Sequence, residues 1–149
     1  MVRIVTARKE HLDDILRIEK ECFSLPWTRE QLEKQLDEER YVFLAAEDET
    51  GAAVGYVGLM YVLDEGYISN VAVTPLRRRE GIADMLLSEL YEKAREKKLS
   101  FLTLEARLGN IAAQSLYKKH GYTQVGLRKN FYDKPREDAV LMTCYLNEE

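Results

Sequence analysis

Hydrophobic residues recur at two different spacings along this chain, and each spacing predicts one kind of element. Residues 2–7 (VRIVTA) form a short apolar run typical of a strand. Residues 41–47 (YVFLAAE) and 52–63 (AAVGYVGLMYVL) are two further runs, and the turn-forming DETG between them predicts a β-hairpin. Within 11–23 the apolar positions lie mostly three or four apart, as on one helix face. These positions are Leu12, Ile15, Leu16, Ile18 and Phe23.

The residues around Thr28 predict the start of a second helix. Thr28 and Gln31 have the spacing of a capping box, in which each side chain bonds the backbone N–H of the other residue. Trp27 and Leu32 flank this start as a hydrophobic staple would.

Strands and helices alternate in the second half of the chain. A strand at 66–73 (GYISNVAV) precedes a helix from about 81 to 97. A strand at 100–105 precedes a helix that starts at Asn110, a good N-cap, and stops before Gly121. The end of the chain has a strand–loop–strand pattern. The expected order is therefore β-α-α-β-β-β-α-β-α-β-β.

This order predicts an α/β fold with a mixed (α+β) sheet, in a single domain over 1–149. The two strands within 66–105 should be parallel and joined by a right-handed crossover. Ligands of open α/β sheets bind beyond the carboxyl ends of strands where the topology changes direction. Those ends are Val71-Ala72-Val73 and Glu105, so we expect them to meet at one crevice.

Composition narrows the classes of function. The net charge of −4 argues against a general nucleic-acid binder, which would carry a basic face. The N-terminus lacks the apolar stretch of a signal peptide, and the run at 52–63 is too short to span a bilayer. We therefore expect a cytoplasmic protein with no membrane partner. Cys22 and Cys144 have apolar neighbours and are expected to be buried thiols, and no metal-ligand spacing is present.

The segment 77–84 (RRREGIAD) places three arginines at the start of a helix, where the helix dipole disfavours cations. Gly81 permits close backbone approach, and the first amides of a helix have no partners within it. This combination suits an anion such as phosphate. A solvated basic loop, with Glu80 offsetting part of the charge, is the alternative.

The pattern Arg78-x-x-Gly81-x-Ala83, after a strand that ends in VAV, resembles the acetyl-CoA signature of the GNAT N-acetyltransferases. The element order is similar to the GNAT fold along nearly the whole chain. The resemblance implies that the Val71, Ala72 and Val73 backbone pairs with the pantetheine arm of acetyl-CoA. It also implies that a set of backbone amides and Arg78 hold the pyrophosphate. Those amides belong to Arg79, Glu80, Gly81, Ile82, Ala83 and Asp84.

Three further blocks resemble the ribosomal-protein alanine N-acetyltransferases within that family. They are FSLPWT (23–28), LEARLGNIAAQSLYKKHGY (104–122) and RKNFYDKPREDAVLM (128–142). The resemblance implies that the partner is the N-terminal peptide of a ribosomal protein. It implies that loops carrying Trp27 and Tyr132 flank the acceptor, and that Asn110 contacts the cofactor as well as capping its helix. Trp27 could instead act only as the staple.

Glu105 stands at a strand end, where a solvated glutamate is the ordinary interpretation. A catalytic interpretation rests on the amine, which must lose a proton before it attacks a thioester. An α-amine has a pKa of about 8, against about 10.4 for lysine, so one carboxylate could act as its base near neutral pH, directly or through water. The resemblance places the family's base at Glu105. For Tyr117, core packing is the ordinary interpretation, and the resemblance implies proton donation to the departing thiolate.

Three candidate functions are compatible with these residues. The first is an N-terminal protein acetyltransferase in which the α-amine attacks acetyl-CoA directly, without an acyl-enzyme. The second is a GNAT enzyme that acetylates a small-molecule amine, and the third is a CoA-sensing module without turnover. Retention of Glu105 and Tyr117 at the motif positions argues against the third. The oligomeric state is left open.

Overall fold

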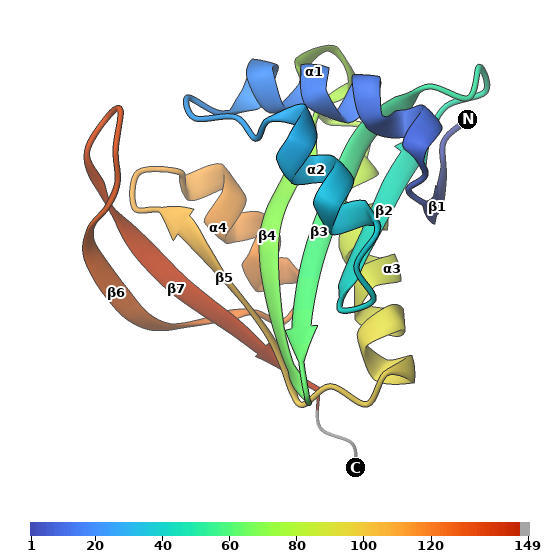
Figure 1. The fold of residues 1–149 in the computed structure, drawn as a ribbon. Helices are drawn as coiled ribbons and strands as arrows, with labels where there is room; N and C mark the ends of the chain where they lie inside the picture. Colours follow the sequence, from blue (N-terminus) through green and yellow to red (C-terminus); the bar gives the residue numbers. More distant parts are fainter. Residues whose placement is uncertain (147–149) are drawn as a thin grey trace.

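A computed structural model describes residues 1–146 and contains seven strands and four α-helices (Figure 1). The N-terminal elements are β1 (Arg3–Thr6), a 3₁₀ turn (Lys9–His11), α1 (Leu12–Cys22) and α2 (Arg29–Leu36). The central elements are β2 (Tyr41–Glu47), β3 (Ala53–Val62), β4 (Glu65–Val73), a 3₁₀ turn (Pro75–Arg77) and α3 (Ile82–Glu96). The C-terminal elements are β5 (Phe101–Arg107), α4 (Ile111–Lys119), β6 (Thr123–Tyr132) and β7 (Glu137–Tyr145).

All seven strands belong to one sheet with the order β1-β2-β3-β4-β5-β7-β6. Neighbouring strands are antiparallel except β4 and β5, which are parallel. The expected element order, the β2–β3 hairpin and the parallel pair joined through α3 are therefore confirmed.

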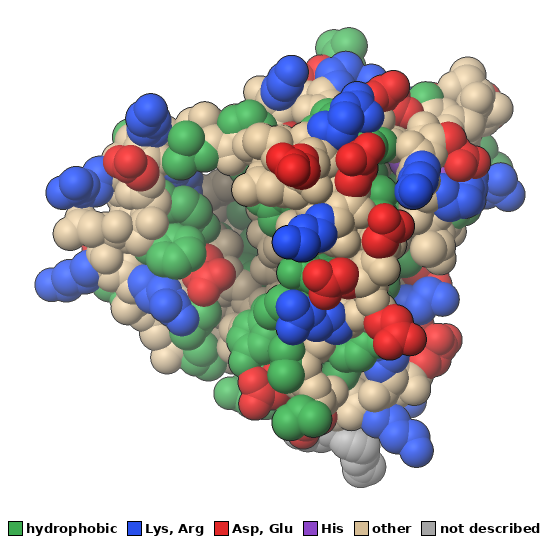
Figure 2. Space-filling model, in the orientation of Figure 1, with side chains coloured by type: hydrophobic (Ala, Val, Ile, Leu, Met, Phe, Trp, Pro, Cys, Tyr) green, Lys and Arg blue, Asp and Glu red, His purple; other side chains and the backbone are tan. Residues whose placement is uncertain are grey.

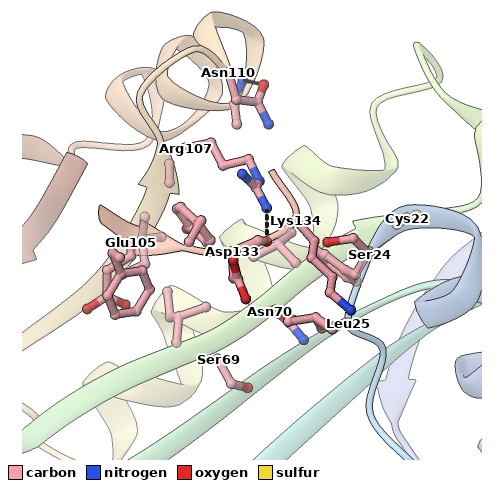
Figure 3. A pocket seen from close by; sticks show the side chains of 18 of the residues that line it. Cys22, Ser24, Leu25, Ser69, Asn70, Glu105, Arg107, Asn110, Asp133 and Lys134 are labelled. Atoms are coloured by element: carbon pink, nitrogen blue, oxygen red, sulfur yellow. Dashed lines mark hydrogen bonds between the residues drawn. The ribbon is translucent and has the colours of Figure 1, made fainter. Parts of the chain in front are cut away.

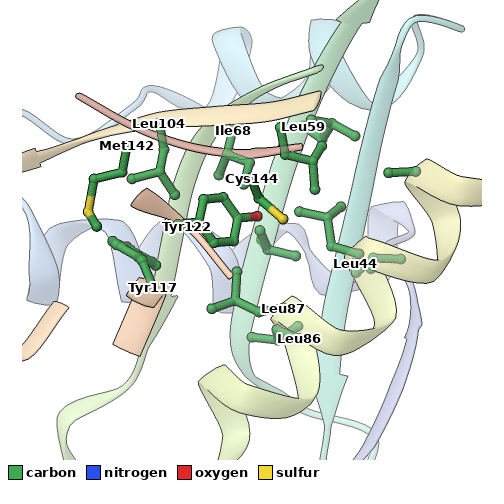
Figure 4. Packing of buried hydrophobic residues seen from close by; sticks show 14 of the residues in the cluster. Leu44, Leu59, Ile68, Leu86, Leu87, Leu104, Tyr117, Tyr122, Met142 and Cys144 are labelled. Atoms are coloured by element: carbon green, nitrogen blue, oxygen red, sulfur yellow. The ribbon is translucent and has the colours of Figure 1, made fainter. Parts of the chain in front are cut away.

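Helices cover both faces of this sheet and enclose two apolar cores. On one face α1 and α2 pack on the first four strands, around Ile15, Ile18 and Leu32. On the other face α3 and α4 cover a larger core that includes Leu86, Leu104 and Tyr117 (Figure 4). Strand residues alternate between the two cores, which is the pattern expected when both faces are buried.

Strands β4 and β5 pair over only a short stretch. Glu65 to Tyr67 lie opposite Phe101 to Thr103, and no pairing continues beyond them. The register between β3 and β4 shifts at Gly58/Leu59, so that Ser69 is an extra residue in β4. A bulge of this kind bends its strand. The carboxyl-terminal half of β4 therefore diverges from β5 and leaves a gap in the sheet.

Local sequence signals fix the helix ends as expected. Thr28 and Gln31 form both bonds of the capping box at the start of α2. The Asn110 side chain accepts a bond from the Ala113 N–H at 3.1 Å. Gly121 follows α4 with a φ of 93°, a left-handed conformation that glycine adopts without strain.

Two expectations were wrong in detail. Tyr132 was expected in a loop, but it forms the end of β6, beyond a second irregularity in the pairing of β6 with β7. Cys144 is buried, whereas Cys22 is only half-buried and borders the site described below. The cause is that α1 ends at Cys22, where the apolar core gives way to the gap beside β4.

No helix within residues 1–146 is both long and apolar enough to cross a membrane.

The packing of α3 on the larger core gives a direct test of the fold. Leu86 is fully buried in this core, whereas Leu76 is 93% exposed. We expect Leu86→Ala to lower the free energy of unfolding by about 2–5 kcal/mol, because it removes buried methyl groups and leaves a cavity. Urea unfolding measures this change. Leu76→Ala is the matched control, and equal effects of the two substitutions would contradict the described packing.

Candidate active site

A cavity of about 680 Å³ occupies the gap between β4 and β5. Its walls come from the α1–α2 loop, β4, β5, the start of α4 and the β6–β7 turn (Figure 3). Figure 2 shows the molecule hollowed between α1–α2 and the β6–β7 hairpin. Six residues predicted for the site line this one cavity. They are Trp27, Val71, Glu105, Asn110, Tyr117 and Tyr132.

Glu105 and Tyr117 reach this cavity from opposite faces of the sheet. Leu104 and Ala106 belong to the α3–α4 core, so Glu105 between them points to the other face, the α1–α2 face. Tyr117 belongs to the α3–α4 core itself. The cavity thus passes through the sheet, with a carboxylate on one side and a phenol on the other.

The edge of β4 that borders the gap presents free backbone groups. The Thr74 N–H bonds the Val54 carbonyl of β3 at 2.8 Å. Because N–H direction alternates along a strand, the N–H and C=O groups of Val71 and Val73 point away from β3 and toward the gap. The side chain of Ala72 is buried in the α1–α2 core. The Val73 carbonyl already accepts from Arg78 and Cys22, so a ligand strand could pair with both groups of Val71 and with the N–H of Val73.

The start of α3 carries six consecutive amides without partners. Within residues 1–146, no carbonyl or side chain accepts a hydrogen bond from the N–H groups of residues 79–84. Gly81 has a φ of 79°, and a Cβ placed there would meet no atom within 4 Å. Unpaired amides and open space at a helix N-terminus fit an anion such as a pyrophosphate. These residues lie past the end of β4 and do not line the cavity.

The arginines before Gly81 have partners of their own. Arg77 donates to Glu80 at 3.0 and 3.1 Å and lies 3.8 Å from Asp48. Arg78 donates through Nε to the Val73 carbonyl at 3.2 Å and through Nη2 to the Cys22 sulfur at 3.3 Å. Two of the three guanidinium groups are thus engaged within the protein.

Other residues of the segment 79–84 contribute to packing through their side chains. Ile82 is buried in the α3–α4 core, and Ala83 packs against that core. The Asp84 carboxylate lies 2.8 Å from Lys119 Nζ and 2.7 Å from His120 Nε2, and these contacts lower its pKa. The start of α3 is thereby tied to the end of α4.

Glu105 is accessible from the cavity and has one basic neighbour. Its side chain is 27% exposed, and its Oε2 lies 3.5 Å from Nε of Arg128 on β6. Burial and the nearby Glu105 charge raise the pKa of Tyr132 to about 12. Glu105 therefore lies between a cation and a neutral phenol and remains open to a ligand.

Tyr117 is buried and stays protonated. Only 8% of it is exposed, and burial raises its pKa to about 12. Its ring lies 6.0 Å from that of Tyr122, and no residue of 1–146 forms a hydrogen bond with its hydroxyl. Both interpretations made from sequence apply, because Tyr117 packs in the core and also borders the cavity.

Apolar side chains surround the mouth of the cavity on the Glu105 side. Leu25 is 58% exposed and Phe131 is 48% exposed. Tyr132 is held by the Arg107 guanidinium, 4.4 Å from its ring centre. Arg107 also donates to the Pro135 and Asp133 carbonyls, which fixes the β6–β7 turn. These surfaces suit an extended peptide better than a compact ion.

Three residues of the site were not identified from the sequence. Arg107 supports the β6–β7 turn, and Asn70 lines the cavity beside the Ser69 bulge. Glu19 is fully buried and bonds Asn70 at 2.9 Å. A signal for Glu19 was present, because it falls four positions after Ile15 on the apolar stripe of α1.

No group of three or more His, Cys, Asp and Glu side chains within residues 1–146 is arranged to hold a metal ion. The expectation of a metal-free site stays a prediction.

The sheet thus opens between β4 and β5, and a helix start with unpaired amides lies next to the gap. The chain belongs to the acetyltransferase (GNAT) family, whose model matches residues 12–122. Its class is that of acetyl-CoA-dependent N-acetyltransferases.

Individual relatives narrow the comparison further. The chain is 37% identical to the [ribosomal protein bS18]-alanine N-acetyltransferase of Haemophilus influenzae, over 89% of this chain and 90% of that protein. It is 30% identical to the enzyme of that name from Escherichia coli, over 84% of each chain. The crystal structure of the ribosomal-protein-S18-alanine N-acetyltransferase from Escherichia coli superposes with a TM-score of 0.91 at 27% identity. That match covers 100% of this chain and 96% of the other.

The buried phenol of Tyr117 predicts a specific pH dependence. In the unfolded chain a tyrosine ionises near pH 10, whereas folded Tyr117 has a pKa of about 12. Between these values the unfolded chain binds fewer protons, so the free energy of unfolding falls as pH rises. When pH is raised from about 9.5 to about 11, the free energy of unfolding of the Tyr117→Phe protein should fall by about 1 kcal/mol less than that of the unmodified protein.

Urea unfolding at both pH values measures this difference. Tyr145→Phe is the control. Because Tyr145 is 58% exposed, its substitution should leave the fall in the free energy of unfolding the same as in the unmodified protein. If Tyr117→Phe loses as much stability as the unmodified protein, the described burial of this phenol is wrong.

Proposed function

We propose that this protein is an N-terminal protein acetyltransferase. It transfers acetyl from acetyl-CoA to the α-amine of the N-terminal alanine of ribosomal protein bS18. The observation that carries the proposal is the pair Glu105 and Tyr117, which reach one through-sheet cavity from opposite faces. The names of the relatives supply the acceptor.

The residues at the start of α3 fit the cofactor. The six free amides of 79–84 and the open space at Gly81 accommodate the pyrophosphate of acetyl-CoA. Val71 offers its N–H and C=O groups, and Val73 its N–H, to the pantetheine arm. Asn110 borders the cavity at the start of α4. Arg78 acts mainly on the protein, since it holds the Val73 carbonyl. When bound, acetyl-CoA supplies the activated acyl group.

The two catalytic side chains divide the proton transfers. Glu105 accepts a proton from the α-ammonium of the peptide, directly or through one water, and thereby frees the amine for attack. Tyr117 keeps its proton at neutral pH because of its raised pKa, so it can donate that proton to the leaving thiolate. The N–H of Val71 faces the gap, where it can stabilise developing negative charge on the acyl oxygen.

Direct transfer is favoured over a covalent acyl-enzyme. Cys22 borders the cavity, but its thiol lies 3.6 Å from the Val73 carbonyl as a donor. Burial raises the pKa of this thiol, and the thiolate is the nucleophilic form. Cys22 therefore remains a protonated packing group, and the two substrates react in a ternary complex.

The acceptor side favours a peptide over a small-molecule amine. A site for polyamine-like substrates would carry an excess of acidic side chains. This cavity has Glu105 and Asp133 balanced by Arg107 and Lys134, together with exposed apolar residues at its mouth. That composition suits an N-terminal peptide better than a polycationic amine. We propose further that the protein acts in the cytoplasm as one domain over 1–149. It does so without nucleic-acid or membrane partners.

A direct assay tests the proposal. The protein is incubated with acetyl-CoA and a peptide that begins Ala-Arg, and both free thiol and peptide mass are followed. We expect thiol release matched by the gain of one acetyl group at the α-amine. Thiol release without a mass gain would exclude this acceptor class. No release with any amine would favour a CoA-sensing module.

The role of Glu105 is tested by Glu105→Gln, which keeps the size of the side chain and removes its basicity. We expect kcat for the peptide to fall by about 10²–10⁴-fold, the usual contribution of a general base. The Kd of acetyl-CoA, measured by calorimetry, should stay nearly unchanged because the base lies away from the α3 amides. Glu92→Gln, on the exposed surface of α3, is the control. An equal loss of acetyl-CoA affinity and turnover would show that Glu105 is not the base.

A further inference from the structure

The last turn of α1 contains a buried carboxylate that the proposed chemistry does not use. Glu19 is 0% exposed. Its Oε1 accepts the Trp27 backbone N–H at 2.8 Å, and its Oε2 accepts the Asn70 side-chain amide at 2.9 Å and the Tyr56 hydroxyl. A buried charge is tolerated only when its oxygens are well bonded, and this one has three donors.

These donors come from three separate parts of the chain. Trp27 belongs to the α1–α2 loop, Tyr56 to β3 and Asn70 to β4. Residues 1–146 contain no Lys, Arg or His within ion-pair distance of Glu19, so hydrogen bonds alone hold it. Burial raises its pKa, and the bonds from Trp27 and Asn70 oppose that shift. The carboxylate is therefore a junction between segments and not half of an ion pair.

Two of the donors belong to walls of the cavity. Trp27 and the adjoining segment from Cys22 to Leu25 line the cavity from the α1–α2 loop, and Asn70 lines it from β4 beside Val71. Asn70 also follows Ser69, the bulge residue that turns β4 away from β5. The Glu19 carboxylate thus links the loop that carries Trp27 to the edge of β4 that is proposed to face the acyl group.

We propose that Glu19 is a positioning residue that holds the acceptor loop 23–28 in register with β4. It acts through the Trp27 N–H and the Asn70 amide, and it does not touch the substrates. The proposal rests on the proposed function for its kinetic consequence. Its structural consequence, the placement of Trp27, can be measured in the absence of any reaction.

The chain offers a matched pair of substitutions for the test. Gln at position 19 keeps an oxygen that accepts from the Trp27 N–H, in place of Oε1. Its amide nitrogen, in place of Oε2, can donate to the Tyr56 hydroxyl oxygen and to the Asn70 side-chain oxygen once the Asn70 amide turns over. Met has similar length and volume but accepts none of these bonds. Glu19→Met therefore removes the junction with little change in packing volume, and Glu19→Gln should restore it.

Trp27 is the single tryptophan of the chain, so its fluorescence reports the acceptor loop directly. We expect Glu19→Met to increase acrylamide quenching of Trp27 about twofold and to raise the peptide KM about tenfold, because buried donors lose their acceptor. The acetyl-CoA KM should change less than about twofold, since the α3 amides are untouched. Glu19→Gln should resemble the unmodified protein in all three measurements.

A second buried carboxylate supplies the control for a general loss of stability. Glu47 is 5% exposed, bonds His11 and Arg3 beside β1 at the edge of the sheet, and does not line the cavity. Glu47→Met should lower the melting temperature but leave Trp27 quenching and the peptide KM unchanged. If it reproduces the effects of Glu19→Met, or if Glu19→Met leaves both quantities unchanged, the proposal is wrong.

Two further outcomes remain decisive. If Glu19→Met does not fold, Asn70→Ala removes the β4 end of the junction and should still increase Trp27 quenching; unchanged quenching would overturn the proposal. If the unmodified protein fails to acetylate the peptide, the proposed function is wrong. The quenching comparison between Gln and Met at position 19 still decides the positioning role.

Discussion

The candidate site depends on the separation of β4 from β5 after three paired residues. Two neighbouring parallel strands ordinarily continue their ladder, because unpaired backbone groups are costly when buried. Here the Ser69 bulge bends β4 away and leaves its last residues, which pair with β3, without a partner on the β5 side. The gap opens a path through the sheet, so that Glu105 and Tyr117 can approach one point from opposite faces. A continuous ladder would close this path and satisfy the amides of Val71 and Val73.

The open edge of β4 is supported by side chains from the end of α1 and from the loop before α3. Glu19 holds Asn70, Glu21 accepts the Thr74 hydroxyl at 2.7 Å, and Arg78 caps the Val73 carbonyl. These bonds replace part of the stabilisation that a neighbouring strand would have given. The substituted bonds leave the N–H groups that face the gap free for a ligand. Some groups of β4 therefore hold the strand in place, whereas the N–H groups that point into the gap stay available to a ligand.

The sequence was sufficient for the elements and insufficient for the contacts between them. Periodicity and caps predicted the order and most element ends, because the Thr28 box and the Asn110 cap depend on residues three apart. Glu105 and Tyr117 could be proposed from topology and family resemblance together. The partners of Arg78 could not, because Cys22 lies 56 positions away and joins it only through folding. Tyr132 was misplaced for the same reason, since its strand conformation depends on pairing with Glu137 after a bulge.

The groups that are free to bind an anion at the start of α3 also differ from those that the sequence suggests. Three arginines before a helix suggest binding by positive side chains, yet Arg77 is paired with Glu80 and Arg78 is bound to Val73 and Cys22. The groups left unpaired are the backbone amides of residues 79–84. An anion at the proposed site would be held by close approach at Gly81 and by the direction of these N–H groups, more than by net charge. A protein with a net charge of −4 can therefore present an anion site without a basic face.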